Sequence, residues 1–190
     1  MSLAKRDEKH HTYADYLRWP EDVRYELIDG VAYAMAGPDL AHQEIVGDVY
    51  RQLANALEGQ PCRAFVAPFD VRLPRPGQDD AETDTVVQPD VMVVRDPAKL
   101  DRRGVRGAPD LVVEVLSPST AGHDQVLKRR VYERAGVREF WLVHPGDRIV
   151  TIYRLQGGAY GKPDIQELSG TTAVRVLPGV AIAWDALAAR

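Results

Sequence analysis

One stretch constrains this chain more than any other: residues 109–120, Pro-Asp-Leu-Val-Val-Glu-Val-Leu-Ser-Pro-Ser-Thr. A short apolar run rich in β-branched residues, bounded by Pro-Asp and Ser-Pro, is typical of a buried strand, and we predict one over 110–116. Because side chains alternate along a strand, Glu114 shares a face with Val112 and Leu116. A buried carboxylate is costly unless it is paired or bound to a metal, so Glu114 needs a partner elsewhere in the chain.

A second apolar stretch, Thr85–Arg95, also contains an acid and is predicted to form another strand. On such a strand Asp90 shares a face with Gln88 and Met92. If the two strands are neighbours with their polar faces together, Asp90 and Glu114 would hold one hard cation, and Mg²⁺ prefers such oxygen ligands. A centre of this kind activates water and stabilises charge on phosphate oxygens, which suits hydrolysis of a phosphodiester.

A lysine follows the Glu114 strand on the next predicted element. Residues His123–Ala135 have helical spacing, and Gly136 is a suitable end for the helix. Asp124, Lys128 and Tyr132 are four residues apart, so they form one row along this helix. Lys128 is therefore the predicted source of an ammonium group at the site. The alternative is an Asp-Lys surface pair beside an amphipathic tyrosine.

The remaining elements are predicted to build a sheet around these strands. Asp-Gly at 29–30 lies between two apolar arms and predicts a hairpin over Tyr25–Met35, with Glu26 on the first arm. A covering helix is predicted over Asp39–Glu58, with His42 in its first turn; such a histidine is more often a surface or half-buried packing residue than a catalyst, and the alternative is that it lines the site. We further predict a helix at 12–18, a strand at 63–73, polar loops at 74–84 and 97–108, strands at 138–144, 148–155, 160–168 and 173–177, and a final helix at 184–189.

Composition limits the class of protein. The chain has 190 residues, a length typical of one domain, and we predict a single α+β domain over 1–190 with a flexible tail over 1–11. The net charge of −4 argues against a protein that coats nucleic acid, although the basic loop 97–108 could meet phosphates. A lone cysteine, Cys62, excludes an internal disulfide, and no apolar stretch is long enough to cross a membrane, so a cytoplasmic location is expected. Metal binding by His10-His11 is a weaker possibility.

Several motifs occur together in an order that resembles a known family. They are Glu26-Leu27-Ile28-Asp29-Gly30, His42-Gln43, Pro89-Asp90-Val91, the whole stretch 109–120, Asp124 with Lys128 and Tyr132, and Gly136-Val137-Arg138-Glu139-Phe140-Trp141. From about Tyr25 to Tyr153 the chain resembles the Uma family of putative restriction endonucleases, within the PD-(D/E)XK nuclease superfamily. The resemblance implies a restriction-endonuclease-like fold with a mixed central sheet flanked by helices.

The resemblance also implies roles for individual residues. Asp90 and Glu114 would be metal ligands, with Glu26 as an additional acid near the metal, which would be Mg²⁺ or Mn²⁺. The superfamily's usual lysine stands two residues after the glutamate, where this chain has Leu116, so Lys128 is expected to replace it, with Tyr132 behind it. Asp110 would be either a further acid of the site or a cap at the start of its strand.

The leading hypothesis is thus a metal-dependent endonuclease acting on DNA, and the resemblance adds the expectation of a homodimer. Leu116 and the acidic net charge keep an alternative open, in which a nuclease fold serves binding or assembly without turnover. A phosphohydrolase acting on small molecules is a third possibility, less favoured because the basic loop suggests an extended anionic partner.

Overall fold

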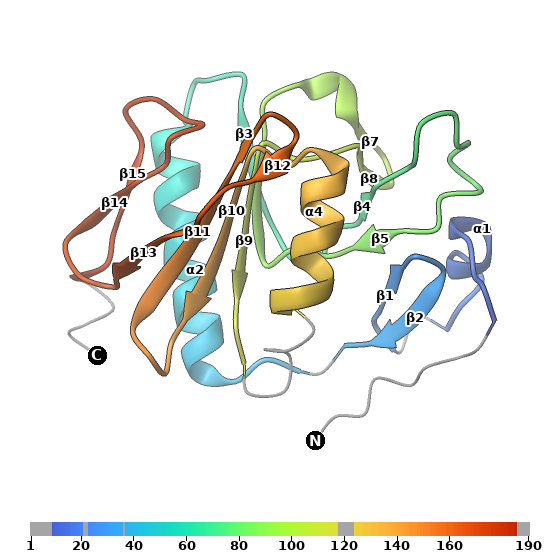
Figure 1. The fold of residues 1–190 in the computed structure, drawn as a ribbon, viewed down its shortest axis with the longest axis horizontal. Coiled ribbons are helices and arrows are strands. Elements are labelled where there is room, and N and C mark those ends of the chain that lie inside the picture. The colour runs from blue at the N-terminus through green and yellow to red at the C-terminus, as the bar shows by residue number, and fades with distance from the viewer. Residues whose placement is uncertain (1–8, 21–22, 36, 118–123, 186–190) are drawn as a thin grey trace.

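The structure is a computed structural model that describes residues 9–20, 23–35, 37–117 and 124–185. The strands form two large sheets and one small one, with helices against the larger of the two (Figure 1). This arrangement is a mixed α+β fold, as predicted. Within the described residues, no helix combines the length and the apolar character that spanning a bilayer requires.

The seven-stranded sheet is built around the strand that bears Glu114. This strand, β9 (Leu111–Val115), runs parallel to β10 (Glu139–His144) and antiparallel to β6 (Val91–Val94). The order is β12 (Ala159–Tyr160), β11 (Ile149–Gln156), β10, β9, β6 and β3 (Arg63–Val66), with β13 (Asp164–Glu167) also paired to β11. The prediction of a buried strand over 110–116 is confirmed, since every residue of β9 is buried.

Each face of this sheet is covered by a different helix. On one face Val113 and Val115 pack with α2 (Leu40–Ala56), whose buried residues are Ile45, Val46, Val49 and Leu53. On the other face Val112 and Leu116 pack with α4 (Arg129–Ala135). Glu114 lies between Val112 and Leu116, two residues from each, so its side chain shares their face of the sheet, which is the α4 face. The helix predicted over 39–58 is confirmed, with Asp39 as its N-cap.

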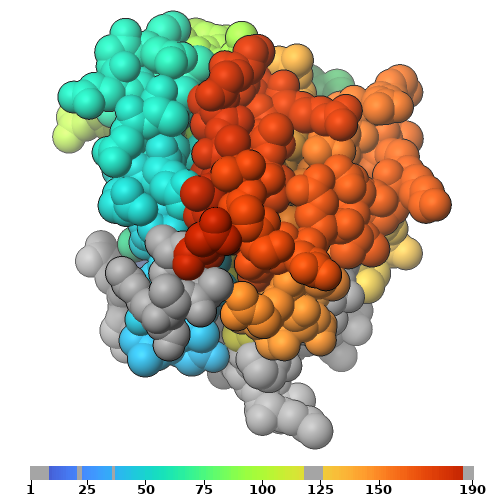
Figure 2. All heavy atoms as spheres, turned by 90° about the vertical axis from the view of Figure 1, so that its left-hand side faces the viewer, coloured from blue at the N-terminus to red at the C-terminus, as the bar shows by residue number. Residues whose placement is uncertain are grey.

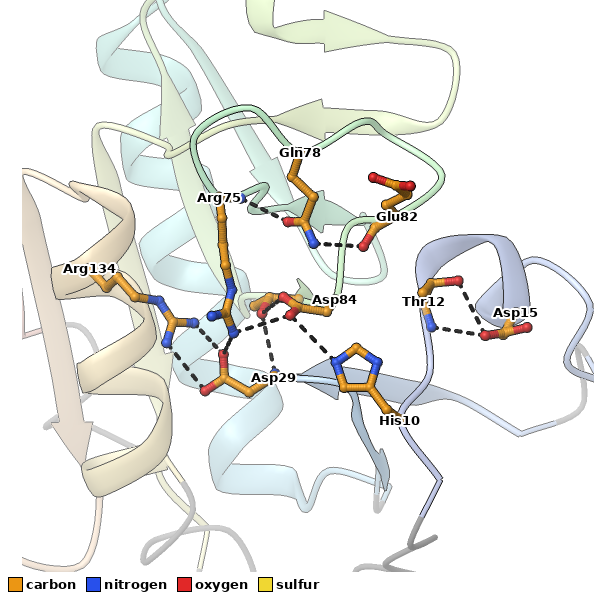
Figure 3. Close-up of polar contacts among 10 residues, drawn as sticks. His10, Thr12, Asp15, Asp29, Arg75, Gln78, Glu82, Asp84 and Arg134 are labelled. Atoms are coloured by element: carbon orange, nitrogen blue, oxygen red, sulfur yellow. Dashed lines mark hydrogen bonds and ion pairs between the residues drawn. The ribbon is translucent and has the colours of Figure 1, made fainter.

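The six-stranded sheet brings the N-terminal half of the chain against the α4 side. Its order is β2 (Val31–Ala34), β1 (Tyr25–Ile28), β5 (Val86–Val87), β4 (Val71–Arg72), β8 (Gly104–Arg106) and β7 (Leu100–Asp101). The predicted hairpin over 25–35 is confirmed, because β1 and β2 pair around a turn in which Asp29 has φ +49° and Gly30 has φ +79°. The short helix predicted from Thr12 is also present as α1 (Tyr13–Tyr16), where the Asp15 carboxylate accepts the Thr12 N–H at 3.0 Å (Figure 3).

Two predicted strands are wrong in their extent because each is divided between the two sheets. The stretch 85–95 forms β5 in one sheet and β6 in the other, and 63–73 forms β3 and β4 in the same way. A proline lies at each break, Pro89 and Pro68, and proline has no N–H to donate to a ladder. At the first break the Gln88 N–H donates to the Glu26 carboxylate at 2.8 Å instead of to a neighbouring strand.

Other predictions need smaller corrections. The basic stretch 97–108 is not a plain loop, because it contains the 3₁₀ helix η1 (Pro97–Lys99), β7 and β8. The helix predicted over 123–135 begins with a π-helical segment, η2 (Asp124–Lys128), before α4. The strand predicted at 173–177 is wrong in its extent, because only Ala173 belongs to a strand, β14 (Thr171–Ala173), which pairs with β15 (Ala181–Ala183), and 174–177 is not a strand. The strand predicted at 160–168 is shorter and appears as β13, with β12 before it.

Residues near both ends of the described chain are hydrogen-bonded to other elements. Figure 2 shows the C-terminal strands beside α2, and Gln52 of that helix bonds both the N–H and the C=O of Ala183, at 2.8 and 2.9 Å. Most of the helix predicted at 184–189 and most of the predicted tail lie outside the described residues. The last residues of that tail are held, since the His11 N–H donates to the Gly30 C=O at 2.8 Å.

Candidate active site

A buried lysine connects two carboxylates at the interface of the two large sheets. The Lys128 ammonium lies 2.9 Å from Glu26 Oε1 and 3.0 Å from Glu114 Oε1. All three side chains are about 4% exposed or less. Because β1 belongs to the six-stranded sheet and β9 to the seven-stranded sheet, this cluster draws on elements far apart in sequence.

Helical spacing explains how one helix supplies two groups to the cluster. Lys128 and Tyr132 are four residues apart and lie on the same face of the helix, toward the sheet. The Tyr132 hydroxyl donates to Glu114 Oε1 at 2.6 Å. Burial raises the pKa of Tyr132 well above its ordinary value, and the nearby Glu114 charge raises it further. The phenol therefore stays protonated and donates a hydrogen bond to the carboxylate.

Asp90 lies next to this cluster at the end of the neighbouring strand. Val91 of β6 pairs with Val113 of β9, so continuing the antiparallel register by one residue sets Asp90 opposite Glu114. The Val115 N–H, adjacent to Glu114, donates to Asp90 Oδ2 at 2.8 Å. The other oxygen, Oδ1, accepts no hydrogen bond from the described residues. The two acids thus occupy the same end of adjacent strands, although Asp90 contacts His42 of α2 and Glu114 contacts Tyr132 of α4, helices that cover opposite faces of the sheet.

His42 was assigned to the surface or to packing by its position in a first turn, and the structure brings it to Asp90. Its Nε2 lies 3.1 Å from Asp90 Oδ2, while its backbone N–H donates to the N-cap Asp39 at 2.9 Å. The carboxylate at 90 is therefore held by a ring from α2 and by a backbone amide from β9. Only the His42-Gln43 motif of the family resemblance pointed toward this contact.

Gln88 supports the cluster and was not foreseen. Its backbone N–H binds Glu26 Oε1, and its side-chain oxygen accepts from the Arg24 guanidinium at 2.7 and 3.1 Å. Its amide nitrogen donates to Asp70 at 2.8 Å and to Tyr16 at 3.2 Å. A glutamine before Pro-Asp carries no periodic signal, so nothing in the sequence pattern predicts this role.

The other candidates lie away from the cluster. Asp110 caps the opposite end of β9, where its Oδ2 accepts the Arg95 N–H at 2.9 Å, as the cap interpretation predicted. The basic stretch is engaged locally, with Lys99 donating to the Ala108 C=O at 2.7 Å. His10 lies 3.7 Å from Asp84, away from the cluster (Figure 3). The side chain of Asp124 falls outside the described structure.

Charge decides what the cluster can bind. Among the described residues, the carboxylates of Glu26, Asp90 and Glu114 outnumber the basic groups beside them, which are the Lys128 ammonium and the His42 ring. Burying net charge without compensation is costly, and a divalent cation would compensate it. Among the described residues no group of three or more His, Cys, Asp or Glu side chains is arranged to hold a metal ion. Two carboxylates still suit Mg²⁺, which retains several waters and takes further ligands from substrate phosphates.

Comparison with known proteins identifies a matching family model and similar proteins. Residues 13–186 match the Uma2 family model, described as "Putative restriction endonuclease". The uncharacterized Synechocystis protein slr1290 is 34% identical over 122 residues, covering 62% of this chain and 60% of that protein. A second, sll1609, is 30% identical over 125 residues, covering 64% and 67%. The matched region thus spans about three-fifths of the first relative's length.

A solved structure has the same fold. The crystal structure of a putative nuclease belonging to DUF820 from Anabaena variabilis superposes with a TM-score of 0.73. The match covers 93% of this chain and 97% of that one at 20% sequence identity. At that level of identity the likeness concerns the fold.

Proposed function

Because this chain belongs to the Uma2 family of putative restriction endonucleases, we propose that it is a divalent-metal-dependent endonuclease that hydrolyses phosphodiester bonds in DNA. The observation that carries the proposal is the buried group of Glu26, Glu114 and Lys128 beside Asp90, in which carboxylates outnumber the basic side chains among the described residues. A single ion pair would be neutral, whereas this buried group has an excess of carboxylates, two of which, Asp90 and Glu114, lie at the same end of adjacent strands.

Each residue has a distinct role in the proposed mechanism. Asp90 and Glu114 would hold the cation, with Glu26 as the additional acid. When bound, a divalent cation supplies a Lewis acid that activates water and offsets charge on phosphate oxygens. Lys128 stabilises negative charge that develops on the phosphate, or activates the attacking water. Tyr132 restrains Glu114 by donating to Oε1, so that the orientation of the carboxylate is fixed before substrate binds.

Cleavage of plasmid DNA in Mg²⁺ or Mn²⁺ tests the proposal directly. Glu114→Gln removes the charge with little change of volume, and we expect the cleavage rate to fall by roughly 10²–10³-fold. Asp110→Asn is the matched control, because it makes the same kind of change at the other end of β9. Cleavage that survives Glu114→Gln, with both variants folded, would exclude Glu114 from the site.

A second candidate function is a nuclease-fold protein that binds without turnover. It is favoured by Leu116 at the usual lysine position and by the Lys128 ammonium, which already neutralises part of the charge of Glu26 and Glu114. Calorimetry separates the two candidates. The enzyme requires binding of Mg²⁺ or Mn²⁺ that Asp90→Asn weakens, whereas the absence of any cation binding favours the second function.

Two further measurements test the substrate class and the oligomeric state. Model phosphodiesters compared with oligonucleotides distinguish a nuclease from a small-molecule phosphohydrolase. Assembly as a homodimer is a further part of the proposal, and the edge strand β13, with Ile165 60% exposed, offers an apolar contact. Sedimentation showing only a 21.1 kDa species would exclude the dimer.

A further inference from the structure

A second ionic cluster joins the β1–β2 hairpin to α4 on the surface. Asp29, in the hairpin turn, accepts from both ends of the Arg134 guanidinium, with Nη2–Oδ1 at 2.6 Å and Nη1–Oδ2 at 3.3 Å (Figure 3). Arg75 completes the cluster, because its Nη2 lies 3.0 Å from Asp29 Oδ1 and 3.1 Å from Asp84 Oδ2. The carboxylate of one turn residue thus binds two arginines from other parts of the chain.

The backbone of the turn is itself fixed. The Asp29 N–H donates to Thr85 Oγ1 at 3.3 Å, and the Gly30 N–H donates to the Asp84 C=O at 2.8 Å. These bonds anchor the turn to the residues that lead into β5. Asp29 also has φ +49°, a conformation that aspartate and asparagine tolerate better than most residues. The backbone hydrogen bonds of the turn therefore fix the position from which the Asp29 carboxylate binds Arg134.

The same two elements carry part of the candidate active site. Glu26 lies three residues before Asp29, and Lys128 lies six residues before Arg134. The buried pair Glu26–Lys128 and the exposed pair Asp29–Arg134 therefore connect the hairpin to the helix at two separate points. No strand pairing joins the two large sheets within the described residues; the hairpin meets α4 through the shared hydrophobic core, in which Ile28 packs with Val131 and Tyr132, and through these two ionic contacts.

We propose that Asp29 and Arg134 are positioning residues, which hold the strand of Glu26 and the helix of Lys128 at the separation that the site requires. The inference rests on the proposed nuclease function. Asp29 and Arg134 are 45% and 46% exposed, and exposed ion pairs add little to stability. Their contribution is geometric, because a shift of about 1 Å in a catalytic group can lower a rate up to roughly a hundredfold.

A pair of arginine variants on one helix tests this role. Arg134→Gln removes the ion pair between Asp29 and Arg134, which we call the clamp. Arg130→Gln removes an exposed arginine one turn earlier that makes no ion pair in the described structure. We expect Arg134→Gln to lower kcat about tenfold with KM for DNA unchanged, and Arg130→Gln to leave kcat unchanged. Asp29→Asn, which tolerates the same backbone conformation, should reproduce the effect of Arg134→Gln. Equal kcat values for the Arg134 and Arg130 variants would overturn the proposal.

A background variant shows whether the clamp acts through Glu26. In Glu26→Gln protein, adding Arg134→Gln should lower kcat no further, because the group being positioned is already changed. Two independent losses that multiply would contradict a role in positioning Glu26.

Hydrogen exchange tests the clamp without relying on activity. Amides of the β1–β2 hairpin should exchange faster in Arg134→Gln and Asp29→Asn than in the wild type or Arg130→Gln. If the wild type cleaves no DNA, the proposed function fails, and this measurement still decides whether the clamp exists. Unchanged exchange in both clamp variants would overturn the inference by itself.

Discussion

Two buried basic side chains each bridge two carboxylates in this molecule, and they differ in how their partners meet water. Arg72 of β4 lies 2.6 Å from Asp80 and 2.5 Å from Asp101, which are 33% and 48% exposed. Lys128 binds Glu26 and Glu114, which are as buried as the lysine itself. Each base meets two acids, but water solvates the acids of the Arg72 cluster, whereas the acids around Lys128 are removed from water, and a cation would offset the cost of burying their charge.

The chemistry of the two bases fits this difference. The Arg72 guanidinium is planar and permanently charged, and its central carbon lies 5.4 Å from the centre of the Tyr13 ring. The group therefore connects β4 to α1 as well as to its two carboxylates. Lys128 is a point charge on a flexible stem, able to adjust when a ligand enters. We therefore interpret the Arg72 cluster as structural and the Lys128 cluster as functional.

The sharpest way to break this distinction is to neutralise Lys128. In Lys128→Gln the amide still donates a hydrogen bond but the charge is gone, so we expect DNA cleavage to fall by about a hundredfold. The measurement is the single-turnover rate at saturating Mn²⁺, with the melting temperature recorded alongside. A folded Lys128→Gln protein that cleaves at the wild-type rate would remove the lysine from the mechanism.

Cation binding should distinguish the clusters next. The wild type should gain about 2.7 kcal/mol of stability when Mn²⁺ is present at a hundred times its dissociation constant. Asp90→Asn should lose most of this gain, and Asp101→Asn should keep it, since Asp101 belongs to the Arg72 cluster. Thermal unfolding with and without Mn²⁺ measures both. Equal stabilisation of the two variants would mean that the cation binds elsewhere.

Replacing Arg72 should lower the stability of the fold without lowering the cleavage rate, whereas replacing Lys128 should lower the cleavage rate. Arg72→Met keeps the apolar stem but removes the hydrogen bonds that Arg72 donates to Asp80 and Asp101, so we expect a loss of about 1–3 kcal/mol in the free energy of unfolding. Cleavage per folded molecule should be unchanged at temperatures below the melting transition. Urea unfolding measures the free energy of unfolding. A lower cleavage rate without a loss of stability would contradict a structural role for the Arg72 cluster.

The sequence predicted those parts of the site that depend on local periodicity. Alternation along the Glu114 strand assigned its side chain to the correct face, and four-residue spacing brought Lys128 and Tyr132 together. Glu26 could be associated with the site only through the family resemblance, because it arrives from another sheet. The roles of these residues in catalysis remain predictions.

The parts that sequence reasoning missed depend on long-range pairing. Pro89 indicates that the ladder over 85–95 is interrupted, but nothing local indicates that the two halves join different sheets, because both are apolar and β-branched. The contacts of His42 with Asp90 and of Arg72 with Asp101 join residues 48 and 29 positions apart. Single polar residues have no periodicity, so their partners become visible only when the tertiary fold is known.

The smallest expected effect concerns acid stability of the Arg72 cluster. The hydrogen bond from Arg72 holds the pKa of Asp101 below its ordinary value, with a further contribution from the Arg103 N–H. A carboxyl group with a lowered folded-state pKa contributes stability above its unfolded pKa of about 4 and loses it as pH falls through the folded value. Since Asp101 is 48% exposed, solvent screening reduces this contribution to well under about 1 kcal/mol.

Asp101→Asn isolates that contribution. The wild type should be slightly more stable than the variant at pH 6, and the difference should shrink as the pH falls below about 4, because protonated aspartic acid and asparagine interact similarly with Arg72. High salt should reduce the difference at pH 6, since the pair is accessible to counterions. Urea midpoints measured from pH 6 to pH 3 supply the test. A difference that stays constant over this range would mean that Asp101 stabilises the fold through packing rather than charge, and the contrast with the buried Lys128 cluster would then lose its electrostatic basis.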